Sequence, residues 1–183
     1  MADASPIDIL VATGAVTEGH FLLPDGSHAE RLLRVGKATQ FAPYNRRLCY
    51  QIVRHFLELD IHVIVAASVG AIPAAVEVGR QLEARTVFVD ADGAALHEGF
   101  ELHEGERVVV VVDILLEDRG LDPHAALIRR ADARLIGIGS IVDARTAKTR
   151  MMVRDVCAAR LPYAPVPAER CPLCASGVPL SAL

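Results

Sequence analysis

The fold is best predicted from residues 107–113, Arg107-Val108-Val109-Val110-Val111-Val112-Asp113. It places valine at five consecutive positions between an arginine and an aspartate. A strand with one face in water alternates apolar and polar residues, whereas a strand covered on both faces is apolar throughout. The stretch therefore predicts a central strand of a parallel sheet, with Val110 fully buried and Asp113 at its carboxyl end.

Helix and strand patterns alternate on both sides of this stretch, from residue 43 to residue 142. Helices are expected where apolar residues recur every three or four positions, and strands where short apolar runs occur. Such alternation predicts an α/β fold, with a mainly parallel central sheet flanked by helices. The expected helices are 43–59, 72–82 and 123–131, and the expected strands are 63–66, 86–89, 108–112 and 135–142.

The two ends of the chain break this alternation. A short helix is expected from Ser5-Pro6, and a strand enters the turn at Asp25-Gly26. The last forty residues contain five prolines, which predicts an extended tail or a small appended piece. We expect one domain, with a core of about 41–146 and a hood made of about 1–40 and 147–183.

Composition excludes several classes of protein. The chain has 183 residues, of which 52% are hydrophobic and 23% charged, so it is not disordered. Its longest apolar stretch, 63–76, is shorter than the roughly 20 residues that cross a bilayer, so no membrane partner is expected. The net charge is −4 and no basic stripe is present, which argues against nucleic acid. The N-terminus lacks a signal-peptide pattern, so a cytoplasmic location with reduced cysteines is expected.

Two loops at carboxyl ends of strands are candidates for chemistry, because open α/β sheets bind ligands there. The first loop contains Ser68, Val69 and Gly70 and leads into a helix, which suits either phosphate binding or a tight turn. The second loop runs from Asp113 to Gly120 and suits either ligand hydroxyls and Mg²⁺ or a solvated turn. Its candidate ligand-binding residues are Asp113, Glu117, Asp118, Arg119 and Gly120.

Six segments, read in order along the chain, resemble one known family. They are residues 19–28 (GHFLLPDGSH), 63–73, 96–100 (LHEGF), 105–113, 141–143 (IVD) and 171–180 (CPLCASGVPL). The chain resembles the type I phosphoribosyltransferases, and among them the orotate phosphoribosyltransferase family, over nearly its whole length. The resemblance implies the family's fold, a two-fold homodimer, and a pocket for phosphoribosyl pyrophosphate at the two loops described above.

Several positions depart from the pattern that the resemblance implies. The family's central strand ends in two adjacent acids that hold the ribose hydroxyls, and here Val112 replaces the first. The family's phosphate loop is rich in small residues and hydroxyls, and here Glu117 and Asp118 bring negative charge, which Arg119 offsets only in part. Each carboxylate would oppose a phosphate by up to roughly 4 kcal/mol at about 4 Å.

Cations that the family uses are also replaced. Its mobile loop carries lysine and arginine, whereas residues 88–106 here contain neither, so His97 and His103 are the candidate substitutes. The arginine that follows the family's IVD segment is Ala144 here. Arg145 is the next candidate for the base pocket, although it needs a shifted turn to reach there.

These departures favour a protein with degraded ribose, phosphate, pyrophosphate and base sub-sites, catalytically inactive and serving as a binding, regulatory or assembly subunit. A nucleotide or other phosphate-containing ligand and an unknown protein partner fit this hypothesis.

The alternative is an active phosphoribosyltransferase with a rearranged site. In that case Mg²⁺ is expected as a cofactor, with Asp113 on the ribose, Arg119 on the 5′-phosphate, and His97 or His103 on the pyrophosphate. The homodimer is expected to use residues 28–37 and the helix that starts at Ile72.

Cys171 and Cys174 have the spacing of half a zinc-binding site. A structural zinc needs four ligands, and the tail supplies no others, so a turn that pins the tail is the favoured interpretation. Cys157 or a distant histidine is the alternative that would complete a metal site. His20 and His28 flank the Asp25-Gly26 turn, and we expect them to be turn and interface residues.

Overall fold

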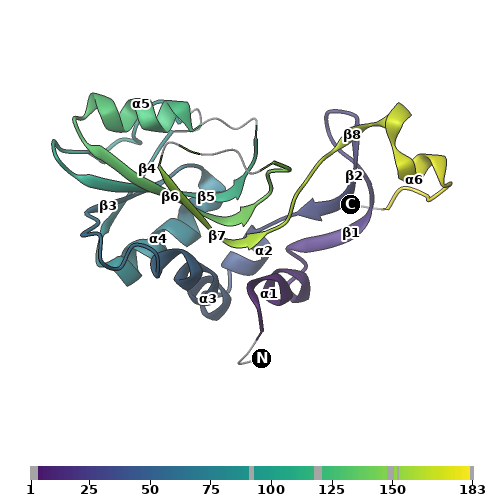
Figure 1. The fold of residues 1–183 in the computed structure, drawn as a ribbon, viewed down its shortest axis with the longest axis horizontal. Helices are drawn as coiled ribbons and strands as arrows, with labels where there is room; N and C mark the ends of the chain where they lie inside the picture. The colour runs from purple at the N-terminus through teal and green to yellow at the C-terminus, as the bar shows by residue number, and fades with distance from the viewer. Residues whose placement is uncertain (1–3, 91–92, 118–120, 148–150, 152, 182–183) are drawn as a thin grey trace.

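The computed structural model contains a central sheet of five parallel strands in the order β4-β3-β5-β6-β7 (Figure 1). The structure describes residues 4–90, 93–117, 121–147, 151 and 153–181. Neighbouring strands pair in parallel throughout the sheet. The strands are β3 (Val63–Ala66), β4 (Arg85–Phe88), β5 (Arg107–Leu115), β6 (Arg134–Asp143) and β7 (Arg154–Arg160).

β5 lies at the centre of the sheet and is covered on both faces, as its valines predict. Val108, Val109, Val110 and Val111 have no exposed surface, and Val112 is 6% exposed. Successive side chains of a strand point to opposite faces. Accordingly, Val109 and Val111 pack in one core cluster, whereas the valines at 108, 110 and 112 pack in a second.

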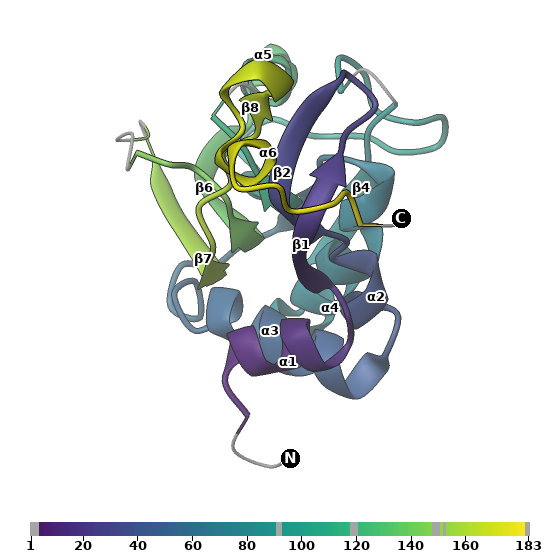
Figure 2. The ribbon, with the colours of Figure 1, turned by 90° about the vertical axis from the view of Figure 1, so that its right-hand side faces the viewer.

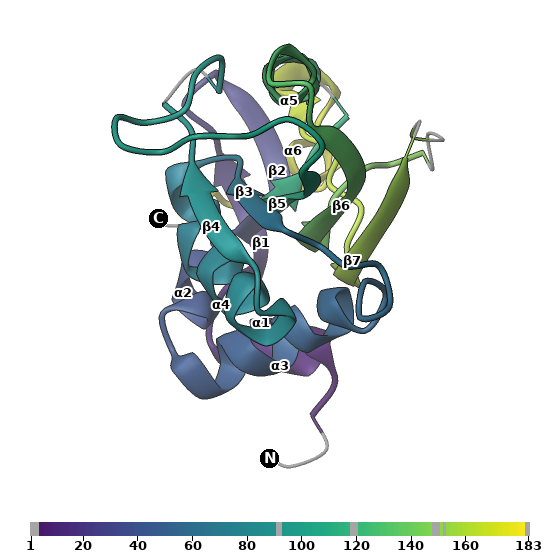
Figure 3. The same ribbon diagram turned by 90° about the vertical axis from the view of Figure 1, so that its left-hand side faces the viewer.

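Helices cover both faces of the sheet. α3 (Ala42–Val53) and α4 (Ile72–Leu82) pack on one face, and α5 (Asp122–Arg130) packs on the other (Figures 1 and 3). The sequence placed α4 correctly and α5 within one residue, whereas α3 ends at Val53 rather than at residue 59. No helix in the described part of the chain is long and apolar enough to cross a bilayer.

A second, smaller sheet forms the hood, which we define as residues 15–33 and 161–181. β1 (Val16–Leu22) and β2 (Ser27–Leu33) make an antiparallel hairpin, and β8 (Val166–Pro167) pairs with β2 (Figure 2). The connecting turn contains Gly26, whose φ of 83° suits glycine. Beyond β8 come η2 (Ala168–Arg170) and α6 (Pro172–Ala175). The β1–β2 hairpin and the C-terminal tail therefore pack together in the hood.

Three short helices complete the fold. α1 (Pro6–Ala12) begins at Ser5, whose hydroxyl accepts from the Asp8 backbone N–H at 3.2 Å. The Asp8 carboxylate accepts in return from the Ser5 N–H at 2.8 Å, which completes a capping box. α2 (Gly36–Thr39) precedes α3, and η1 (Val69–Ala71) precedes α4.

Both bounds of the hood expected from the sequence are wrong. The sequence assigns residues 147–183 to the hood, but β7 pairs with β6 and is the fifth strand of the central sheet. It also assigns residues 1–40 to the hood, but α1 and α2 pack in the core cluster of α3 and α4. β7 contains only one fully buried residue, Ala159, because it is an edge strand. Its apolar run, Val156 to Ala159, has one β-branched residue and stands between charged residues, so it lacks the β-branched pattern typical of a central strand.

A glycine-to-alanine change tests how tightly α3 and the sheet are packed. A Cβ at Gly137 on β6 would lie 2.7 Å from Phe56 Cε1 and 2.8 Å from the carbonyl oxygen of Arg154. We expect Gly137→Ala to lower the free energy of unfolding in urea by about 1–3 kcal/mol, because the backbone of β7 must move. Gly36→Ala is the control, because a Cβ there meets no atom within 4 Å. Equal stability of the two variants would contradict this packing.

Candidate functional site

The carboxyl ends of β5 and β6 face the hood across a cleft of about 660 Å³. Residues after β5 and β6 form one wall of the cleft, and the hood forms the other. The lining residues are Leu23, Pro24, Asp25, Leu116, Glu117, Ala144, Thr146, Tyr163, Ala164 and Pro165. A cleft at this edge is where open α/β sheets bind ligands.

The charged side chains of this cleft are both carboxylates, Asp25 and Glu117. The Ser27 hydroxyl donates to Asp25 at 2.6 Å and lowers the pKa of that carboxyl. The Ala147 N–H donates to Glu117 at 2.8 Å and, with the Thr146 hydroxyl, lowers the pKa of Glu117. Both groups are therefore anionic at neutral pH. Among the described residues that line the cleft there is no lysine, arginine or histidine.

The sequence places Asp113 just after a strand of 108–112, but β5 continues to Leu115 and contains Asp113, because the pairing with β6 runs on to Asp143. Asp113 lies against the loop that follows β3. Its carboxylate accepts a hydrogen bond from the Ser68 hydroxyl at 3.2 Å, and a Cβ at Gly70 would collide with it. The structure thus brings together Asp113, Ser68 and Gly70, which the sequence singled out on two separate loops. Val69 is 79% exposed and points away from the core. The Asp113 carboxylate therefore lies directly against the Ser68–Gly70 segment of this loop.

Two further residues shape this edge. The Ser68 hydroxyl also accepts from the Ala71 N–H at 3.2 Å, which caps η1. His124 on α5 is buried, and its Nε2 lies 3.2 Å from the Ala67 carbonyl oxygen. Burial lowers the pKa of His124, more than the bond to Ala67 raises it, so the ring is neutral and donates to that carbonyl. No sequence pattern predicts this role, because a lone histidine within a helix matches no motif.

Arg145 is buried and held by two carboxylates. Its Nε donates to Asp143 at 2.8 Å, and its Nη2 donates to both Asp143 and Asp155. Arg160 also donates to Asp143, at 2.8 Å. These four side chains help to line a separate cavity of about 170 Å³. The assignment of Arg145 to a base pocket stays a prediction, and such a role requires Arg145 to leave these partners.

The remaining candidates lie apart from the cleft or outside the described residues. His97 and His103 are exposed, and His97 Nδ1 lies 3.3 Å from the Glu98 carbonyl oxygen. Asp118, Arg119 and Gly120 lie outside the described residues. Cys171 and Cys174 lie in the hood, where they meet His20 and His28. The sequence leaves open that a distant histidine joins these cysteines, but it does not identify His20 and His28, because the two pairs are separated by more than 140 residues.

Comparison with known proteins places this chain in a family. It is 31% identical over 178 residues to the orotate phosphoribosyltransferase of Chlorobium phaeobacteroides strain DSM 266, covering 96% of this chain and 92% of the relative. The chain belongs to the orotate phosphoribosyltransferase family. The orotate phosphoribosyltransferase of a Thermoanaerobacter species is also 31% identical, over 95% of this chain and 93% of its own. No family model matches.

Solved structures agree with this family at the level of the fold. UMP synthase of Leishmania donovani superposes with a TM-score of 0.71 at 17% identity, over 85% of this chain and 36% of that one. Orotate phosphoribosyltransferase of Aeropyrum pernix gives 0.65 at 18% identity, over 85% and 93%. Adenine phosphoribosyltransferase of Rhodothermus marinus gives 0.64 at 14% identity, over 84% and 98%. The fold expected from the sequence is thereby confirmed.

The Arg145 cluster makes a prediction about acid stability. Burial alone would raise the pKa of Asp143, but the hydrogen bonds and charge of Arg145, with the charge of Arg160, outweigh burial and lower it. A carboxyl whose pKa is lowered on folding stabilises the protein above its unfolded pKa of about 3.9, and the stabilisation disappears as pH falls through the folded value. We expect Asp143→Asn to cost about 3–5 kcal/mol at pH 7, because Arg145 loses a buried partner.

Urea unfolding at several pH values measures this cost. The difference between the unmodified protein and Asp143→Asn is expected to be largest at neutral pH and to shrink below about pH 4. Glu58→Gln is the control, because Glu58 is exposed, and its effect is expected to stay within about 0.5 kcal/mol. A cost for Asp143→Asn that does not change with pH would contradict the ion-pair account.

Proposed function

We propose that this chain is a member of the orotate phosphoribosyltransferase family that lacks ordinary transferase activity and serves as a binding, regulatory or assembly subunit. The observation that carries this proposal is the charge of the cleft beneath the hood. Among the described residues that line it, Asp25 and Glu117 are the charged groups and no side chain is cationic. Phosphoribosyl pyrophosphate is strongly anionic, so this described part of the lining opposes rather than attracts it.

The repulsion between these carboxylates and the phosphates of the ligand depends on how far water screens each group. A carboxylate repels a nearby phosphate charge, and the repulsion is stronger where water does not screen it. Glu117 and Asp25 are solvent-exposed, so screening lowers the cost of each. Asp113 is half-buried against the loop of Ser68 and Gly70 and is less screened. Micromolar binding needs about 8 kcal/mol of net favourable free energy, which is hard to reach against these terms.

A magnesium ion would relieve such repulsion, but the carboxylates are poorly placed to hold one. Val112 stands where the family resemblance implies the first of two acids, and it is packed in the core. Glu117 already accepts hydrogen bonds from Thr146 and Ala147. Among the described residues, no group of three potential metal ligands lies at this edge of the sheet. Asp143 at the end of β6 is paired with Arg145 and Arg160, so Asp113 is the carboxylate on the described strands β5 and β6 that remains for Mg²⁺.

Within the described lining of the cleft, no cation is placed to stabilise a departing pyrophosphate. Transferases of this kind develop negative charge on the leaving group, which fixed positive charge stabilises. His97 and His103 are exposed and line none of the described wall of the cleft. Arg145 is committed to Asp143 and Asp155. The proposal therefore does not rest on a single altered residue.

Transfer of phosphoribose to orotate tests the proposal directly. Loss of one well-placed electrostatic donor slows a reaction by about 10²–10³, so two such losses leave about 10⁻⁴–10⁻⁶ of normal turnover. We expect no measurable formation of orotidine monophosphate from orotate, phosphoribosyl pyrophosphate and Mg²⁺. Turnover at about one per second or faster, within the usual enzyme range, would support the rearranged active site instead.

Repair of the site separates binding from rate. Val112→Glu with Leu116→Thr, Glu117→Thr and Asp118→Gly is expected to gain binding of phosphoribosyl pyrophosphate before it gains turnover. Ligand at about 100 times Kd stabilises a protein by about 2.7 kcal/mol, which thermal unfolding detects. Because Val112 is buried, a second variant keeps it and changes only residues 116–118.

Glu104→Thr is the control for charge removal, because Glu104 is exposed on the loop before β5. It is expected to leave the response to phosphoribosyl pyrophosphate unchanged. If neither repaired variant binds while both fold, the electrostatic explanation is wrong. If the unmodified protein already shows the full shift, the cleft accepts phosphoribosyl pyrophosphate as it stands.

A homodimer remains part of the proposal. Arg31 and Arg34 on or beside β2, and Lys37 on α2, are expected to face the partner subunit or a shared cleft. Light scattering at micromolar concentration measures the assembly, and twice the chain mass is expected. A monomer would contradict this expectation.

A further inference from the structure

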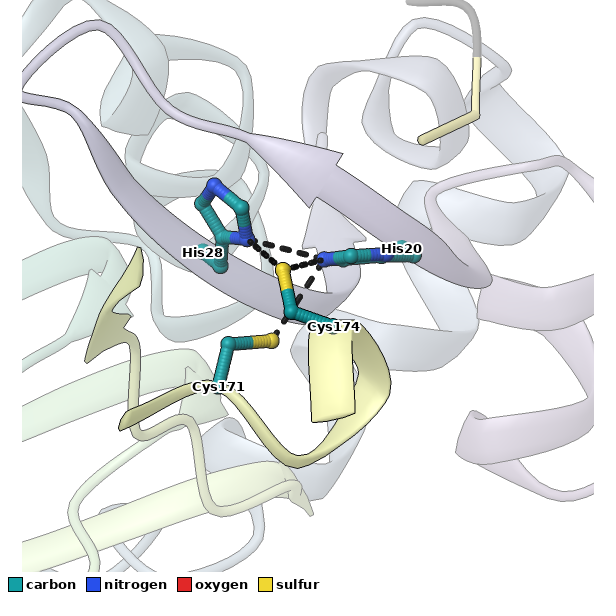
Figure 4. A group of neighbouring side chains, drawn as sticks. All are labelled: His20, His28, Cys171 and Cys174. Carbon is teal, nitrogen blue, oxygen red and sulfur yellow. Dashed lines mark hydrogen bonds between the residues drawn. The ribbon is translucent and has the colours of Figure 1, made fainter. Parts of the chain in front are cut away.

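Four potential metal ligands converge in the hood, away from the cleft described above. They are His20 on β1, His28 on β2, Cys171 before α6 and Cys174 within α6. Their ligand atoms all lie within 4.8 Å of one another. Figure 4 shows the two imidazoles and the two thiols pointing toward one centre. The described residues contain no other such group.

The distances between these atoms match the edges of a small tetrahedron. Cys171 Sγ and Cys174 Sγ lie 3.4 and 3.6 Å from His20 Nε2, and Cys174 Sγ lies 3.3 Å from His28 Nδ1. Tetrahedral bonds of about 2.3 Å to sulfur and about 2.0–2.1 Å to nitrogen give sulfur–nitrogen edges of roughly 3.5 Å. The two nitrogens are 2.8 Å apart, and their edge needs to open by roughly half an ångström.

The protonation of His20 suits a metal ligand. Its Nδ1 lies 2.7 Å from the Val178 carbonyl oxygen, which can only accept, so Nδ1 carries the proton. Nε2 is then a bare lone pair aimed at His28 and the two sulfurs. A metal-bound histidine commonly donates its other N–H to a backbone carbonyl in this way. The acceptor here belongs to the same C-terminal tail that carries both cysteines.

The tail has little else to hold it in place. Of residues 164–181, Cys171 alone is buried, at 4% exposed. β8 contributes only two residues to the hood sheet, and α6 is four residues long. Such a segment buries too little apolar surface to offset the entropy lost on ordering it. By contrast, His20 and His28 are buried on the hairpin, at 1% and 7% exposed.

We propose that His20, His28, Cys171 and Cys174 bind one structural Zn²⁺, which fastens the C-terminal tail to the β1–β2 hairpin. Two thiolates and two neutral imidazoles balance the charge of the ion, and their mixed sulfur and nitrogen donors suit zinc. Binding releases the two thiol protons to solvent and requires no redox step. With four protein ligands the ion has no open position, so its role is structural rather than catalytic.

Metal analysis of the full-length protein, purified under reducing conditions without chelator, tests this site. About one zinc per chain is expected. After replacement with Co²⁺, the intense visible absorption of tetrahedral cobalt and a thiolate charge-transfer band are expected. Cys174→Ser is expected to lose both signals, and it is chosen because Cys174 is exposed and its loss leaves the core intact. Cys157→Ser, on β7 and outside the cluster, is the matched control and keeps both.

Limited proteolysis tests the structural role separately. Removal of zinc by a chelator, or Cys174→Ser, is expected to speed tryptic cleavage after Arg170, the residue next to Cys171 in the exposed η2 turn. Cleavage in Cys157→Ser is expected to stay slow until chelator is added. Three results would each overturn the proposal: a reduced protein that takes up no zinc, a Cys171–Cys174 disulfide in the freshly purified protein, or full zinc content in Cys174→Ser. None of these readouts depends on transferase activity.

Discussion

The burial of β5 on both faces is the constraint on which the rest of the structure depends. Five valines in succession have no polar face to offer water, so α3 and α4 must cover one side and α5 the other. Parallel pairing with β3 and β6 then aligns the carboxyl ends of these strands at one edge. The Ser68 loop and Glu117 follow the carboxyl ends of β3 and β5, and Asp113 near the end of β5 accepts a hydrogen bond from Ser68 at this edge.

Near the carboxyl end of β5, one residue packs in the core and the next carries a charge. Val112 extends the apolar run by one residue and packs with Val110 and Ile138 on the α5 side. Asp113, on the opposite face of the strand, turns toward the loop of Ser68 and Gly70. A valine in place of an acid thus adds to the core and removes a charge from the site in one substitution. The proposed loss of transferase activity follows from Val112 together with the carboxylates of the cleft.

The sequence predicted the elements whose signals are local. β3 and α4 have the expected bounds, and β5 is central and buried because its valines leave no alternative. β7 was missed because an edge strand needs no run of β-branched residues. The Asp143–Arg145–Asp155 cluster and the full four-ligand group in the hood were also not identified. Each depends on residues that tertiary contacts bring together, and no spacing along the chain encodes such a meeting.

The site and the hood carry different kinds of interaction. The cleft is open and acidic, and its effect on a ligand is electrostatic. The hood is small, poor in apolar burial, and is held by a few directional contacts at His20, His28 and the tail. A crystal soaked with phosphoribosyl pyrophosphate and Mg²⁺ tests the central claim about the cleft most directly. No bound ligand is expected, and Asp113 is expected to stay against the Ser68–Gly70 loop. Pyrophosphate bound on that loop, with Asp113 turned toward a ribose, would contradict the proposed loss of transferase activity.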